Sequence, residues 1–156
     1  MAIKYAVTKI KPQYRGEDVE GNRVWGTPVQ YLSKSERQVY RITFQGGKIY
    51  DASGALFDTT DASTVFSGEG KAIFVMDENG DFYASKFQQV GRFHHSSLAG
   101  GEPVAAAGEM KVEHGVLILL SNKSGHYRPG RTFTEQALDS LSRKGISTDG
   151  VTRDFV

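Results

Sequence analysis

The sequence predicts an α+β domain in which antiparallel strands predominate and a helix lies near the C-terminal end. Three observations support this: 156 residues suit one domain, 18 glycines accompany 9 Phe and 7 Tyr residues, and short apolar runs are separated by turn residues. Residues 1–28 are polar with poor periodicity, so we interpret them as an arm or linker that precedes a domain spanning residues 29–156.

The first elements of the domain are a short helix and a hairpin. Ser33 and Glu36 have the spacing of a capping box, in which each side chain bonds the other's backbone amide, so a helix is expected to begin there. Residues 40–44 alternate between apolar and polar, as in a half-buried strand. The glycines at 46–47 should turn the chain so that residues 48–50 pair back.

Two more hairpins are predicted further along the chain. Residues 72–76 are continuously apolar, as in a strand buried on both faces, and Asn79-Gly80 is a strong hairpin signal that leads to a partner strand at 82–84. A second pair of apolar runs, at 110–112 and 116–120, flanks a short turn in the same way.

The C-terminal helix has both a start signal and a stop signal. Thr132 and Glu135 repeat the capping-box spacing, and the apolar residues that follow fall on one helical face. Gly145 then favours an end to the helix.

Composition excludes several classes of function. The absence of cysteine excludes disulfides, thiolate metal sites and cysteine nucleophiles. A net charge of +1 shows no basic excess of the kind that marks binding of DNA or RNA. No apolar run approaches the ~18 residues of a membrane helix, and the first ten residues lack the apolar core of a signal peptide.

Rare polar side chains gather in what we call the central motif, residues 91–109 and 124–129. It contains Phe93-His94-His95-Ser96-Ser97, then a run of small residues ending at Glu109, then a Gly-His-Tyr sequence at 125–127. Taken singly, each residue also has a structural explanation: a hydrogen-bonded core histidine, a turn serine, or a glycine that permits close packing. Together they indicate a site, because small residues let a ligand approach the backbone while His, Ser and Tyr orient it.

Other chemistries fit the central motif less well. No H-E-x-x-H is present, so metal ligands drawn from His94, His126 and Glu109 would be arbitrary, and we predict no metal site. No G-x-S-x-G indicates a serine hydrolase, and no G-x-x-x-x-G-K-[ST] indicates a phosphate loop.

The central motif resembles a domain found at the C-termini of bacterial polymorphic toxins such as Rhs proteins. The same signature is similar to one in plant IQ-motif calmodulin-binding proteins. Residues 48–59 and 72–76 also resemble the toxin form, and the resemblance covers roughly residues 29–150.

Several toxins similar to this domain are ADP-ribosyltransferase-like, which implies antiparallel sheets packed around a cleft that binds NAD. The resemblance implies catalytic roles for Glu109, Ser97 and His95, and NAD-binding roles for Arg41, Phe93, His94, Ser96, His126 and Tyr127. Glu109 follows Ser97 more closely than the family's glutamate does, so Glu135, Asp139 and Asp154 are alternative carboxylates. Arg41 would have to reach the site from a strand far earlier in the chain.

These residue types suit cleavage of NAD. A carboxylate would stabilise the positive charge that develops on the ribose, an arginine would bind the pyrophosphate through two hydrogen bonds, and an aromatic ring such as Phe93 or Tyr127 would stack on nicotinamide.

The resemblance thus predicts a toxin domain that transfers ADP-ribose from NAD to a protein or RNA of a target cell. A bacterial secretion system, such as type VI, would deliver it to the target-cell cytoplasm during competition between bacteria. We expect a monomer with no membrane insertion, and a cognate immunity protein as partner. An NAD glycohydrolase, a non-catalytic ligand- or protein-binding module and, as a lesser possibility, a nuclease are the alternatives.

Overall fold

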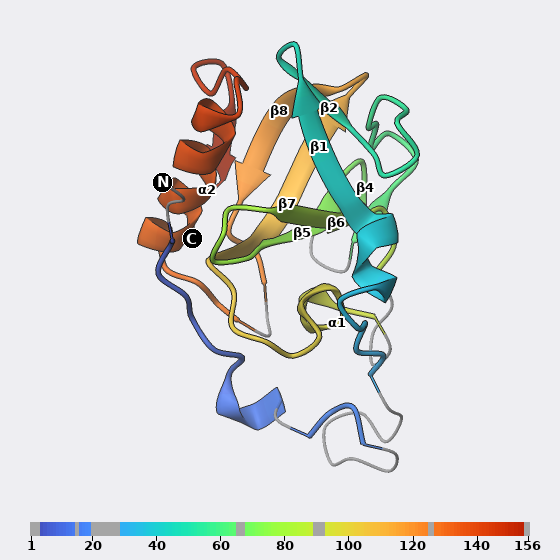
Figure 1. Cartoon of the computed structure of the whole chain (residues 1–156), viewed down its shortest axis with the longest axis vertical. Coiled ribbons are helices and arrows are strands. Elements are labelled where there is room, and N and C mark those ends of the chain that lie inside the picture. The colour runs from blue at the N-terminus through green and yellow to red at the C-terminus, as the bar shows by residue number, and fades with distance from the viewer. Residues whose placement is uncertain are drawn as a thin grey trace.

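The computed structural model describes residues 4–14, 16–19, 29–64, 68–88, 93–124 and 127–154. A curled sheet of seven strands lies at its centre, in the order β2-β1-β6-β5-β7-β8-β9 (Figure 1). Its neighbouring strands pair antiparallel, except for the parallel pair β8 and β9. The strands are β1 (Arg41–Gln45), β2 (Lys48–Tyr50), β5 (Ala72–Met76), β6 (Phe82–Ser85), β7 (Ala106–Glu113), β8 (Val116–Ser121) and β9 (Thr152–Asp154), with β3 (Ser63–Thr64) and β4 (Gly68–Glu69) forming a separate small pair.

Helices cover both faces of the sheet. The helical elements are η1 (Pro12–Tyr14), η2 (Glu36–Tyr40), α1 (His95–Ala99) and α2 (Arg131–Arg143). Successive residues of β5 point to opposite faces, and the buried apolar side chains accordingly form two clusters. Phe74 packs in the cluster that contains Leu141 of α2, whereas Ile73 and Val75 pack in the cluster that contains Leu98 of α1.

The sheet curls because its β2 end comes back toward the turn between β7 and β8. The amide of Ile49 donates to the carbonyl of Gly115 at 2.8 Å, and the amide of Gly115 donates to the carbonyl of Phe57 at 2.8 Å. The cluster under α2 is enclosed by this curvature.

The three predicted hairpins are confirmed by the strand pairing. Residues 48–50 pair with β1, β5 pairs with β6 across the Asn79-Gly80 turn, and β7 pairs with β8. The capping box is confirmed as well, since the Ser33 amide donates to Glu36 at 2.9 Å and the Glu36 amide donates to Ser33 Oγ at 3.1 Å.

One local prediction is wrong. Thr132 does not cap α2: the helix begins at Arg131, with Gly130 as its N-cap, so Thr132 lies inside the first turn.

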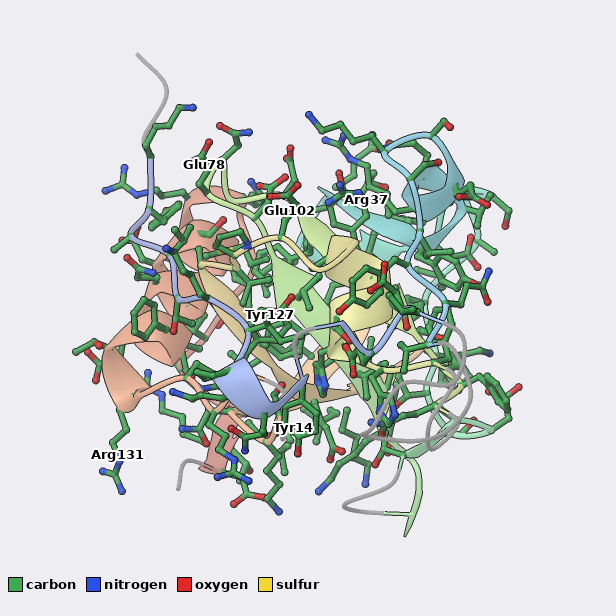
Figure 2. All side chains as sticks on the ribbon, turned by 90° about the horizontal axis from the view of Figure 1, so that it is seen from below. Tyr14, Arg37, Glu78, Glu102, Tyr127 and Arg131 are labelled. Carbon is green, nitrogen blue, oxygen red and sulfur yellow. The ribbon has the colours of Figure 1, made fainter. Side chains whose placement is uncertain are left out.

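The described part of the predicted N-terminal arm packs against the sheet and α2. We call residues 4–14 and 16–19 the N-terminal segment. Tyr5 donates its amide to the carbonyl of Glu78 and its hydroxyl to Asp139, each at 2.8 Å. The Gln136 side chain bonds the amide and the carbonyl of Ala6 at 3.0 and 2.9 Å. The segment then runs across the side of the sheet that carries α1 (Figures 1 and 2).

No helix within the described ranges is long and apolar enough to cross a membrane.

Candidate functional site

The first half of the central motif forms α1, a single helical turn. The His94 amide donates to Ser97 Oγ at 3.0 Å, which closes the start of the turn. Gly100 ends it in the left-handed region, at φ 60°, and its amide donates to the carbonyl of Ser97 at 3.2 Å. Because the turn is helical, its side chains spread around an axis instead of alternating across a strand.

His95 ties α1 to the sheet. Its side chain is buried, and Nε2 lies 2.6 Å from the carbonyl oxygen of Gly108 on β7. A carbonyl oxygen can only accept, so Nε2 must carry the hydrogen in this bond. The His94 side chain also has a hydrogen-bond partner, since its Nδ1 lies 3.3 Å from Nε2 of Gln88.

Ser96 contacts an acidic side chain from the N-terminal segment. Its Oγ donates to Oε1 of Glu17 at 2.6 Å, and the Tyr31 hydroxyl donates to the same oxygen at 2.8 Å. Glu17 and Ser96 are both completely buried. Burial, followed by the hydrogen bond to Glu17, raises the pKa of Tyr31, so its hydroxyl remains a donor.

Glu109 lies on β7, on the face of the sheet that carries α1. It lies two positions after Ala107, which belongs to the cluster on that face, and its amide donates to Ser121 Oγ at 3.0 Å. The fold therefore brings the predicted catalytic residues His95, Ser97 and Glu109 to one side of the sheet. Their exposed fractions are 1%, 0% and 0%, which leaves no surface for a substrate to contact.

The two aromatic side chains expected to stack on nicotinamide belong to the core. Phe93 is 6% exposed and its ring centroid lies 5.5 Å from that of Tyr40. Tyr127 is fully buried, and its hydroxyl donates to the carbonyl of Glu102 at 2.8 Å (Figure 2). Burial is the main cause that raises the pKa of Tyr127. His126 lies outside the described residues.

Arg41, the predicted pyrophosphate ligand, binds elsewhere. Its guanidinium forms an ion pair with Asp81 at 3.1 Å, next to the β5–β6 turn, and 42% of the side chain is exposed. Arg41 borders two surface pockets, and none of the other predicted site residues that the structure describes lines either of them.

The described glycines of the central motif let other parts of the chain approach closely. A Cβ on Gly108 would lie 1.8 Å from the carbonyl oxygen of Ser121, and one on Gly100 would lie 2.7 Å from that of Leu32. A Cβ on Gly101 would lie 2.4 Å from the ring of Tyr31. Close packing, the structural explanation for these residues, therefore accounts for them without a ligand.

The alternative carboxylates lie on α2 and β9. Asp139 on α2 accepts from Tyr5 and Arg143, each at 2.8 Å, and Asp154 on β9 pairs with Lys123 at 2.8 Å. Glu135 is an exposed residue of α2. Across the part of the chain that the structure describes, no group of three or more His, Asp or Glu side chains is arranged to hold a metal ion.

Comparison with known proteins decides between the two resemblances of the central motif. The family model for the IQ motif-containing protein middle domain matches residues 36–134. This chain belongs to that family. Three relatives from Arabidopsis thaliana are IQ domain-containing proteins: IQM3, 36% identical over 124 residues, IQM2, 36% identical over 115 residues, and IQM5, 32% identical over 120 residues.

These matches cover most of this chain but a small part of each relative. They span 79%, 73% and 73% of this chain, and 26%, 18% and 23% of IQM3, IQM2 and IQM5. The chain therefore spans about a quarter or less of the length of these relatives. No solved structure matches it, so the ADP-ribosyltransferase-like fold stays an untested prediction.

The membership corrects the function predicted from the toxin resemblance. The family and its three plant relatives are described as IQ motif or IQ domain proteins, and none of these descriptions names a toxin, a transferase or an NAD-using enzyme. The predictions of a bacterial Rhs toxin, of an ADP-ribosyltransferase, of NAD as substrate and of delivery by a bacterial secretion system are wrong. Nothing supports an immunity protein as partner.

Proposed function

We propose that this chain is a non-catalytic protein-binding module of an IQ motif-containing protein. The observation that carries the proposal is the burial of the central motif. Apart from the exposed Glu102 and Arg128, its described polar side chains are at most 4% exposed. His95, Ser96 and Ser97 bond the chain's own groups. A catalytic site needs reactive groups that reach a substrate, whereas these groups close the α1 turn and bond it to β7 and to the N-terminal segment.

The surface that fits a partner lies where β1 separates from β6. Arg41 pairs with Tyr83, but β6 continues to Ser85 without a described partner on the β1 side. A pocket of about 240 Å³ opens there, between the end of η2 and the loop after β2. Val39 and Leu56 line it and are 70% and 41% exposed. Large apolar side chains that stay exposed around a pocket are typical of an interaction site.

The charge around this pocket favours a basic partner. The two basic side chains in its described lining are already paired, Arg41 with Asp81 at 3.1 Å and Lys86 with Asp61 at 2.8 Å. Asp51 also lines the pocket, and the hydrogen bond from Ser53 is the main cause that lowers its pKa.

Asp58 is the second acidic residue in the lining. Hydrogen bonds from the side chain and backbone of Thr60 hold its pKa well below the usual range. These carboxylates therefore stay ionised near neutral pH. We expect the partner to be an extended segment that places an apolar side chain in the pocket and a Lys or Arg beside it. The calmodulin resemblance concerns whole plant proteins, so the partner of this module is argued from its own surface.

The test is selection from a library of random peptides displayed on phage, with the purified chain as bait. Selected peptides should combine an apolar residue with Lys or Arg, and Val39→Asp should weaken their binding at least about tenfold in fluorescence anisotropy. Val19→Asp is the matched control, because Val19 is 60% exposed but does not line the pocket. Selection of acidic or purely polar peptides, or equal weakening by both variants, would overturn the proposal.

A further inference from the structure

Glu17 is a fully buried acid whose side chain forms hydrogen bonds with residues distant from it in the sequence. Its Oε1 accepts from Ser96, 79 residues away in sequence, and from Tyr31. Its backbone is fixed as well, since its amide donates to the carbonyl of Tyr14 at 3.2 Å and its carbonyl accepts from the amide of Val29 at 2.9 Å. A buried carboxylate is stable only when hydrogen-bond donors replace water, and two hydroxyl groups do so here.

The two donors are held in place without Glu17. The Leu32 amide donates to the carbonyl of Ser97 at 3.1 Å, which joins the segment that contains Tyr31 to α1. Gly100 and Gly101 let this segment approach, because a side chain at either position would collide with Leu32 or Tyr31. Ser96 and Tyr31 therefore present converging hydroxyls from parts of the chain that are bonded to each other, and the N-terminal segment supplies only the acceptor.

The acceptor also comes from outside the family domain. Ser96 lies within the matched residues 36–134, whereas Tyr31 and Glu17 precede them. We propose that Ser96 and Tyr31 form a carboxylate-binding pocket, and that Glu17 of the N-terminal segment is its occupant in this chain. An acidic side chain of a partner would compete with Glu17 for the two hydroxyls, and the N-terminal segment would then leave the α1 face.

Chemical rescue in the full chain tests this proposal. Glu17→Ala removes a CH₂–COO⁻ group, which acetate matches in shape and charge. The variant should melt at a lower temperature than the wild type, because two buried hydroxyls lose their acceptor. Acetate should then raise its melting temperature saturably, by about 3–6 °C at ten times the dissociation constant. Acetamide, the neutral analogue, should rescue it less, and acetate should not stabilise the wild type.

Two further variants keep the test decisive. In the double variant Glu17→Ala with Ser96→Ala, the acetate effect should disappear, because one donor is gone. If Glu17→Ala fails to fold, Glu17→Gln replaces it, and faster hydrogen exchange at the Val29 amide is expected, with Asp18→Asn as the exposed neighbouring control. Equal stabilisation of wild type and variant by acetate, or unchanged exchange in Glu17→Gln, would overturn the proposal.

Discussion

Substitution of Gly108 by alanine should cause a large loss of stability, because the new methyl group would meet backbone. Its Cβ would lie 1.8 Å from the Ser121 carbonyl oxygen, and ordinary contact begins near 3.4 Å, so β8 would have to withdraw by 3.4 − 1.8 = 1.6 Å. The same movement would stretch the bond from the Glu109 amide to Ser121 Oγ from 3.0 Å toward 4.6 Å, beyond hydrogen-bonding range.

The expected cost follows from these two effects. Overpacking costs about 1–3 kcal/mol, and each lost hydrogen bond adds about 1 kcal/mol. With one or two bonds lost, the total is about 2–5 kcal/mol, or about 4–20 °C in melting temperature for a chain of this size. Thermal unfolding followed by circular dichroism measures it.

Gly150→Ala is the matched control for this experiment. A Cβ added to Gly150 would meet no atom within 4 Å, and the residue has no positive φ, so its substitution should stay within about 0.5 kcal/mol of the wild type. A Gly108→Ala variant as stable as Gly150→Ala would refute the conclusion that close packing accounts for Gly108.

Three further predictions concern single side chains. Asp58 has a folded-state pKa below its unfolded value, so its carboxylate stabilises the fold above about pH 4, and this contribution is lost as the pH falls. Asp58→Asn should therefore lower the free energy of unfolding, measured in urea, more at pH 7 than at pH 3. An equal loss at both pH values would contradict this. Tyr127→Phe removes one buried hydrogen bond and should cost about 1–2 kcal/mol in urea unfolding; a neutral effect would show that the bond contributes nothing. For His95, nitrogen NMR should find Nε2 protonated at neutral pH, and an unprotonated Nε2 would exclude its bond to Gly108.

The sequence by itself determined the elements whose cause is local. The Asn79-Gly80 turn, the strands on either side of it, and the capping box of Ser33 and Glu36 each depend on residues a few positions apart. The same is true of α2, although Gly130 and not Thr132 occupies its N-cap position. Local turn and capping preferences are visible in any window of the chain.

Only the tertiary structure decided what the central motif does. His95 and Ser96 have partners 13 and 79 residues away, at Gly108 and Glu17, and no local pattern reveals such pairs. Glu17 lies in a stretch whose sequence is typical of a linker. The sequence does not show that its side chain is buried, because a buried acid and a solvated one look alike in sequence. Hydroxyl and imidazole groups are costly to bury, and they are buried here because they find hydrogen-bond partners inside the fold. Whether a polar side chain is exposed to water or hydrogen-bonded in the core therefore depends on what the fold packs against it.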